Sequence, residues 1–121
     1  MELIIFKILS LLLTLICFIS GIITFVSNPG IVYSQINENI NSENNIYCSH
    51  CKFKYPDLGQ TLTHCFECGV CYIGRDHHCN VFGKCVAKKN LNIFSTFSLS
   101  ICFLLMGNFA SMGYIMISIK N

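Results

Sequence analysis

A run near the middle of the chain, Asp76-His77-His78-Cys79, combines the three side-chain types of a nucleophilic site. The thiolate is the reactive form of cysteine, and a neighbouring imidazole favours that form. A carboxylate beside the imidazole can hold it in one tautomer, as the third member of a catalytic triad does. We therefore predict that Cys79 is a nucleophile, that His77 is its base and that Asp76 orients His77.

The same region contains cysteine pairs with the spacing of zinc ligands. Cys48-x-x-Cys51 is followed by His64-Cys65-x-x-Cys68-x-x-Cys71, and then by His78 and Cys85. A two-residue gap lets both thiolates of a pair reach one tetrahedral ion at about 2.3 Å. Six sulfurs and two imidazoles make two complete Cys₃His sites, and full coordination indicates structural zinc. The predicted ligands are Cys48, Cys51, Cys65, Cys68, Cys71, Cys85, His64 and His78.

Other assignments of these residues remain open from spacing alone. The pairing of ligands with ions cannot be read from spacing, and ligand counting does not distinguish His77 from His78, so His77 or Cys79 could itself bind metal. Scattered core cysteines are disfavoured because the pair spacing repeats. A RING-type ubiquitin ligase would need a final CxxC pair, which is absent after Cys71.

We predict that His50, inside the first pair, is a surface residue, and that nearby aromatic residues pad the metal sites: Tyr47, Phe53, Tyr55, Phe66, Tyr72 and Phe82.

Two apolar runs enclose the cysteine-rich region. No charged residue occurs from Ile8 to Ser27 or from Asn90 to Ile119. Each run has the roughly 20 residues that cross a hydrocarbon core, and we predict two transmembrane helices. A cleaved signal peptide is the alternative for the first run, but the leading Met1-Glu2 contains no basic residue and no convincing cleavage site follows. In the second run, Gly107 and Ser111 have the spacing of a helix-packing pair, and Asn108 is a candidate for a buried polar contact.

Composition and charge place the cysteine-rich region in the cytosol. The chain is 53% hydrophobic and 12% charged, which is unusual for a soluble fold, and its net charge of +2 is too small to argue for nucleic-acid binding. Basic residues lie mainly between the helices, and the positive-inside rule then predicts a cytosolic loop. A reducing compartment also fits the odd number of loop cysteines, seven of the nine. The basic loop residues are Lys52, Lys54, Arg75, Lys84, Lys88 and Lys89, against Lys7 and Lys120 outside the loop.

These observations divide the chain into four predicted segments. Residues 1–30 form the first transmembrane helix and an Asn-Pro-Gly turn, residues 31–47 a polar cytosolic linker, residues 48–90 the zinc domain and residues 91–119 the second transmembrane helix. The zinc domain has too few aliphatic residues for a core of its own, so metal must supply much of its folding free energy. The predicted fold class is a membrane α-helical protein, with two transmembrane helices flanking a cysteine-rich domain that has two zinc sites and little regular secondary structure.

The segment CSHCKFKYPDLGQTLTHCFECGVCYIGRDHHCNVFGKCVAKKNLNIF resembles the cysteine-rich domain of the DHHC protein S-acyltransferases, the palmitoyltransferases. The likeness covers about residues 28–94. Asn28-Pro29-Gly30 is similar to the family's Asp-Pro-Gly turn, Pro56 matches the proline after the first CxxC, and Asn90 with Phe94 matches the entry to the next helix.

The resemblance implies an activity and roles for single residues. Cys79 would accept an acyl group from palmitoyl-CoA or a similar acyl-CoA and pass it to a membrane-proximal cysteine of a substrate protein, with His77 as base and Asp76 orienting it. His78 would be a zinc ligand. The implied pairing is crossed: Cys48, Cys51, His64 and Cys71 on one zinc, and Cys65, Cys68, His78 and Cys85 on the other. The resemblance also implies a multi-pass protein of an endomembrane, the ER or Golgi, with its zinc domain facing the cytosol.

The chain departs from the family pattern at several positions, which include three extra residues between Pro56 and His64, and in its number of apolar runs. Asn80-Val81 stands in place of the usual Pro-Trp, and Lys84 and Ala87 replace the usual Asn and Gly. Family members have at least four transmembrane helices, whereas this sequence contains two apolar runs. Because two helices do not readily enclose an acyl chain, we expect either a piece of a longer protein or a cavity completed by self-association or by a partner. The alternative function is a noncatalytic zinc-binding adaptor at the membrane.

Overall fold

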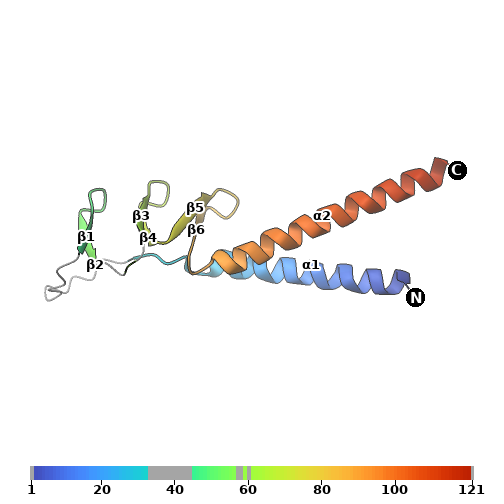
Figure 1. Cartoon of the computed structure of the whole chain (residues 1–121), viewed down its shortest axis with the longest axis horizontal. Coiled ribbons are helices and arrows are strands. Elements are labelled where there is room, and N and C mark those ends of the chain that lie inside the picture. The colour runs from blue at the N-terminus through green and yellow to red at the C-terminus, as the bar shows by residue number, and fades with distance from the viewer. Residues whose placement is uncertain (1, 33–44, 57–58, 60, 121) are drawn as a thin grey trace. The chain divides into compact units, whose positions relative to one another are not determined.

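The computed structural model describes residues 2–32, 45–56, 59 and 61–120. Two long helices stand at the ends of the chain, and three antiparallel β-hairpins lie between them in sequence (Figure 1). The predicted fold class is confirmed, because two long apolar helices flank a cysteine-rich region of short strands. The elements are α1 (Glu2–Val26), β1 (Asn45–Cys48), β2 (Phe53–Pro56), β3 (Leu62–Cys65), β4 (Val70–Ile73), β5 (Arg75–Cys79), β6 (Lys84–Ala87) and α2 (Leu91–Lys120).

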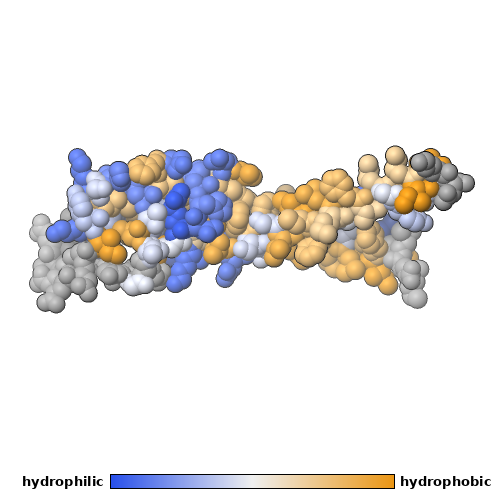
Figure 2. Space-filling model, turned by 45° about the horizontal axis from the view of Figure 1, so that its top comes forward, coloured by the Kyte–Doolittle hydropathy of each residue, from blue (hydrophilic) through white to orange (hydrophobic). Residues whose placement is uncertain are grey.

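The chain separates into two compact units. One unit holds the two helices, Met1–Val26 with Ile93–Asn121, and the other is the hairpin module, Ser27–Asn92. In the helical unit, Ile4–Val26 and Leu91–Ile119 are long and apolar enough to cross a membrane, by length and composition. Large apolar side chains are exposed along both helices, and Figure 2 shows them as a nearly continuous hydrophobic surface. A bilayer would cover such a surface.

The two helices approach each other closely at Gly21 and Phe97, and each helix also buries hydroxyl-bearing residues. A Cβ added at Gly21 would lie 3.0 Å from the ring of Phe97, so glycine at this position allows the close contact. Ser20, Thr24 and Ser100 are buried, and each hydroxyl donates to a carbonyl of its own helix, which satisfies it without water. Asn108 is exposed rather than buried, and its amide donates to the Leu104 carbonyl at 2.9 Å.

The three hairpins have turns of the same length and backbone conformation. Each is closed by a strand pair separated by a four-residue turn: Cys48 with Phe53, Cys65 with Val70, and Cys79 with Lys84. The last turn residue has a positive φ in every case, 58° at Lys52, 69° at Gly69 and 61° at Gly83. Left-handed backbone at the same place closes each turn in the same way, and glycine adopts it without strain.

The segment that follows α1 is held against β4 by backbone hydrogen bonds. The Asn28 side chain accepts from the amides of Gly30 and Ile31 and forms the turn. The Ile73 amide donates to the Gly30 carbonyl, and the Val32 amide donates to the Cys71 carbonyl. Residues 33–44 of the predicted linker lie outside the described residues, whereas its first two residues contact β4 and its last three lie in β1.

Asn90 links the last strand to the start of α2. Its side chain is fully buried, accepts a hydrogen bond from the Ala87 amide at 2.8 Å and donates one to the Cys85 carbonyl at 3.3 Å. Asn90→Ala would leave both backbone groups without this partner, and we expect it to destabilise the module by about 2 kcal/mol. Asn80→Ala, at an exposed turn position, is the matched control and is expected to change stability by less than about 0.5 kcal/mol. Chemical unfolding of the metal-loaded protein measures both, and equal effects would contradict the role of Asn90.

Candidate metal centres and nucleophile

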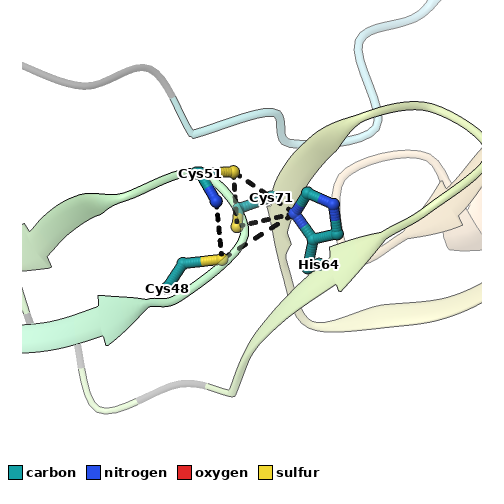
Figure 3. A group of neighbouring side chains, drawn as sticks. All are labelled: Cys48, Cys51, His64 and Cys71. Carbon is teal, nitrogen blue, oxygen red and sulfur yellow. Dashed lines mark hydrogen bonds between the residues drawn. The ribbon is translucent and has the colours of Figure 1, made fainter.

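Two groups of cysteine and histidine side chains converge in the hairpin module. The first joins Cys48 and Cys51, from the first hairpin, to His64 and Cys71, a cross-strand pair of the second (Figure 3). The Nδ1 atom of His64 lies 3.8 Å from the Cys48 sulfur, 3.2 Å from that of Cys51 and 3.7 Å from that of Cys71. We call this group cluster 1.

The second group, cluster 2, repeats the arrangement one hairpin further along the chain. Cys65 and Cys68 from the second hairpin meet His78 and Cys85, a cross-strand pair of the third. The Nδ1 atom of His78 lies 3.7 Å from the Cys65 sulfur, 3.3 Å from that of Cys68 and 3.9 Å from that of Cys85. Both clusters have the membership that the family resemblance implied, and neither contains Cys79 or His77.

The geometry of both clusters fits a tetrahedral ion. Ligand atoms at 2.0 to 2.3 Å from one tetrahedral centre lie about 3.3 to 3.8 Å from each other. The separations between donor atoms agree with this, including 3.5 Å between the sulfurs of Cys51 and Cys71. Three thiols and one imidazole are the donor set of structural zinc.

Burial opposes the ionisation of Cys65 and Cys71, and a neighbouring cation would favour it. Burial raises the pKa of the Cys65 thiol to about 12, and burial also raises the pKa of Cys71 to about 12. Burial disfavours the Cys68 thiolate too, but hydrogen bonds from Tyr72 and neighbouring thiols outweigh it and lower the pKa of Cys68 to about 7. Neutral thiols bind metal poorly, so an ion at either cluster must displace protons from the buried sulfurs.

Residues that were not predicted as ligands support the two clusters. Tyr55 and Tyr72 are 4% and 3% exposed, and their hydroxyls hydrogen-bond the thiols of Cys51 and Cys68 respectively. Arg75 donates from Nε to the Cys85 sulfur at 3.4 Å. Both tyrosines are among the aromatic residues predicted to pad the metal sites, and each follows the second cysteine of a CxxC pair by four residues.

His50 is exposed, as predicted, but it is not isolated. Its ring stacks on that of the ligand candidate His64, with the ring centres 5.1 Å apart, and Phe66 packs edge-on against both. Of the aromatic residues predicted to pad the sites, Tyr55 and Tyr72 are buried, whereas Tyr47, Phe53 and Phe66 are exposed.

Strand alternation separates His78 from the nucleophile candidates. Successive side chains of a strand point to opposite faces, so His77 and Cys79 share one face of β5 and His78 takes the other. His78 turns to cluster 2, and Nδ1 of His77 lies 2.9 Å from the Asp76 carboxylate. Both partners of this pair are substantially exposed, with 43% of the His77 side chain and 59% of the Asp76 side chain accessible. Such a contact orients the ring more than it stabilises the fold.

Comparison with known proteins supplies a family. The family model described as DHHC palmitoyltransferase matches residues 41–121. The chain is 39% identical over 82 residues to palmitoyltransferase ZDHHC9 of Pongo abelii, a match that covers 68% of this chain and 21% of that protein. It is 41% identical over 58 residues to palmitoyltransferase ZDHHC18-B of Danio rerio, covering 48% of this chain and 14% of the relative. Palmitoyltransferase ZDHHC14 of Homo sapiens is 41% identical over 64 residues, which are 53% of this chain and 12% of that protein. The chain thus spans a fifth or less of most of these relatives.

Proposed function

Because the chain belongs to the DHHC palmitoyltransferase family, we propose that it transfers a long-chain acyl group from acyl-CoA to a cysteine of a substrate protein through an acyl-Cys79 intermediate. Membership of this family and the two clusters of cysteine and histidine side chains support the proposal.

One observation carries the proposal. Among the cysteines of the hairpin module, all of which are described, six belong to the metal-binding clusters and Cys79 belongs to neither. Cys79 is also partly accessible, whereas Cys65, Cys71 and Cys85 are almost completely buried. A sulfur outside both clusters, on the same strand face as an imidazole held by a carboxylate, meets the requirements of a thiol nucleophile.

The proposed reaction consists of two thioester exchanges. His77 takes the proton of the Cys79 thiol, and the sulfur attacks the carbonyl carbon of the acyl-CoA thioester. The carbon–sulfur bond to CoA breaks, and the CoA thiolate leaves with the proton from His77. In the second exchange the thiol of a substrate protein gives its proton to His77 and attacks acyl-Cys79, which regenerates the Cys79 thiol. The bond types made and broken are the same, so neither exchange needs a large driving force.

Zinc has a structural role in this proposal. Each cluster offers four ligands to one ion, which leaves no open position for a substrate atom. The two proposed Zn²⁺ ions, one held by Cys48, Cys51, His64 and Cys71 and the other by Cys65, Cys68, His78 and Cys85, would fix the three hairpins and with them the strand that carries Cys79.

The helical unit supplies a surface for the acyl chain. A groove of about 460 Å³ between α1 and α2 is lined almost entirely by apolar atoms, among them those of Phe18, Gly21, Phe25 and Phe97. A chain of about 16 carbons gains on the order of 11 kcal/mol when it leaves water, at about 0.8 kcal/mol per methylene. We propose that the chain lodges among the helices in the bilayer, with the hairpin module on the cytosolic side of an endomembrane.

Covalent labelling tests the proposal against its alternative, a membrane adaptor of the same fold. Purified protein in lipid vesicles is incubated with an alkyne-tagged palmitoyl-CoA, and tryptic peptides are analysed by mass spectrometry. We expect a hydroxylamine-sensitive label on the peptide that contains Cys79. A folded protein that holds its zinc but never takes label would favour the adaptor.

His77→Ala is expected to slow acylation of Cys79 by a factor of about 10² to 10⁴, the usual contribution of a general base. Asp76→Asn should cause a smaller loss, because the imidazole stays and loses only its orienting carboxylate. Single-turnover label formation measures both, with zinc content as the check that cluster 2 is intact. An unchanged rate in His77→Ala would remove His77 from the proposed mechanism.

A further inference from the structure

The third hairpin repeats the turn that holds the metal-binding cysteine pairs. The second and third hairpins read His64-Cys65-Phe66-Glu67-Cys68-Gly69-Val70-Cys71 and His78-Cys79-Asn80-Val81-Phe82-Gly83-Lys84-Cys85. The two octets have histidine, cysteine, glycine and cysteine at the same four places. Of the three cysteines in the octet of the second hairpin, the third hairpin lacks one, the second cysteine of the pair, and has Phe82 in its place.

The backbone repeats along with the sequence. Cys79 closes its turn opposite Lys84, just as Cys48 and Cys65 close theirs opposite Phe53 and Val70. Three residues after the closing cysteine stand Cys51, Cys68 and Phe82, all partly buried, and each is followed by the residue with positive φ. Phe82 therefore occupies the position of a second metal ligand.

The second and third hairpins also correspond in which strand face carries each histidine and cysteine. In the second hairpin, the pair His64 and Cys71 serves cluster 1, whereas Cys65, next along the strand and on the opposite face, serves cluster 2. In the third hairpin, the pair His78 and Cys85 serves cluster 2, and Cys79 is again the next residue. Cys79 is thus turned away from cluster 2 as Cys65 is turned away from cluster 1. In the described part of the chain β6 leads into α2, so no further hairpin follows to offer another histidine and cysteine.

We infer that Cys79 lies at the first-ligand position of a third, incomplete metal-binding turn, and that Phe82 at the second-ligand position keeps Cys79 free of metal. A single thiolate holds zinc weakly, whereas a CxxC turn brings two sulfurs to one ion. Residue 82 thus decides whether Cys79 has a second sulfur beside it with which to hold an ion. The inference rests on the proposed function, in which Cys79 is the acyl acceptor. It explains how the sulfur of Cys79 stays available inside a module that binds zinc.

Phe82→Cys tests the inference by completing the turn. In excess Zn²⁺ we expect this variant to bind about three ions per chain, against about two for the native protein. The added ion should slow alkylation of Cys79 by iodoacetamide roughly tenfold or more, because coordinated thiolates are shielded from electrophiles. Acyl labelling of Cys79 should fall in parallel. Metal content after dialysis and peptide mapping of the alkylated protein give the readouts.

Two matched variants separate the turn geometry from other effects. Val81→Cys adds a thiol one residue earlier, at a side chain that is 86% exposed, and should leave the zinc load at about two ions and Cys79 unprotected. Phe82→Ser removes the ring without adding a ligand and should behave like the native protein in zinc content. Phe82→His keeps a ring at this position and also supplies an imidazole ligand. It therefore repeats the test if Phe82→Cys does not retain the two native ions.

The inference would be overturned if Phe82→Cys and Phe82→His bind no more zinc than Val81→Cys. Protection of Cys79 by Zn²⁺ in the native protein would also overturn it, and this measurement needs no variant. Neither zinc content nor alkylation of Cys79 depends on acyl transfer. A native protein that holds about two ions but takes no acyl label would instead contradict the proposed function and leave the metal result unaffected.

Discussion

Replacing Cys79 with alanine is expected to abolish the hydroxylamine-sensitive acyl label while leaving the zinc content unchanged. Cys79 belongs to neither metal-binding cluster, so its removal should not disturb the ligands of either ion. In the proposed mechanism it is the sole acceptor in the first exchange, and a methyl group cannot form a thioester. Incubation with tagged acyl-CoA, followed by gel fluorescence and metal analysis of the same sample, measures both quantities.

Cys102→Ala is the matched control for this experiment. Cys102 is an exposed cysteine of α2 outside both clusters, and its loss should leave the label on Cys79 intact. Label that persists in Cys79→Ala but disappears in Cys102→Ala would show that the acyl group is carried by the helix cysteine, and it would refute the assignment of Cys79.

Replacing His78 with alanine is expected to empty cluster 2 and unfold much of the hairpin module. His78 is the imidazole donor of that cluster, with its Nδ1 atom within 3.9 Å of three sulfurs. Structural zinc contributes about 10 to 16 kcal/mol in small zinc domains, which equals or exceeds the whole stability of an ordinary domain. Zinc content, resistance of the module to trypsin and acyl labelling should therefore all fall together.

His77→Ala is the informative comparison, because the two histidines are neighbours of the same residue type. It should retain both ions and the protease-resistant module and lose only the rate of acylation. If His78→Ala kept its zinc and His77→Ala lost it, the roles of the two residues would be exchanged and Asp76 would no longer have a catalytic histidine beside it.

Much of the architecture could be predicted from local patterns in the sequence. The long uncharged runs indicated both helices, because a bilayer requires length and low charge and little else. The repeated CxxC spacing indicated metal ligands for a similar reason, since two thiolates of one turn suffice to mark a site. Neither inference needs a contact between distant residues.

Features that depend on distant contacts were harder to predict. Spacing left the pairing of ligands open, because each cluster joins the turn of one hairpin to a cross-strand pair of the next, and only the register places His64 beside Cys71. Ile31 and Val32 were assigned to a linker, because their attachment to β4 is made by the backbone and leaves no pattern of side chains in the sequence. Asn108 was predicted to make a buried contact, but the carbonyl of its own helix satisfies its amide.

The repeat that relates Cys79 to Cys65 was visible in the sequence, but it could not be interpreted there. A phenylalanine in place of a cysteine conceals the match when only ligands are compared. Equal turn lengths and a positive φ at both Gly69 and Gly83 reveal it, because they are properties of the backbone and do not depend on the side chain that was exchanged.

The middle hairpin, β3–β4, contributes ligands to both clusters, His64 and Cys71 to one and Cys65 and Cys68 to the other. An ion at either place therefore orders a hairpin that the other ion also needs, and the two binding events are thermodynamically linked. Loading is then a collective transition with positive cooperativity. Under zinc limitation, a population of these molecules is expected to split into fully loaded and empty chains, with few that carry a single ion. The zinc supply would then set the number of molecules with an ordered hairpin module, and not the degree of order in each molecule.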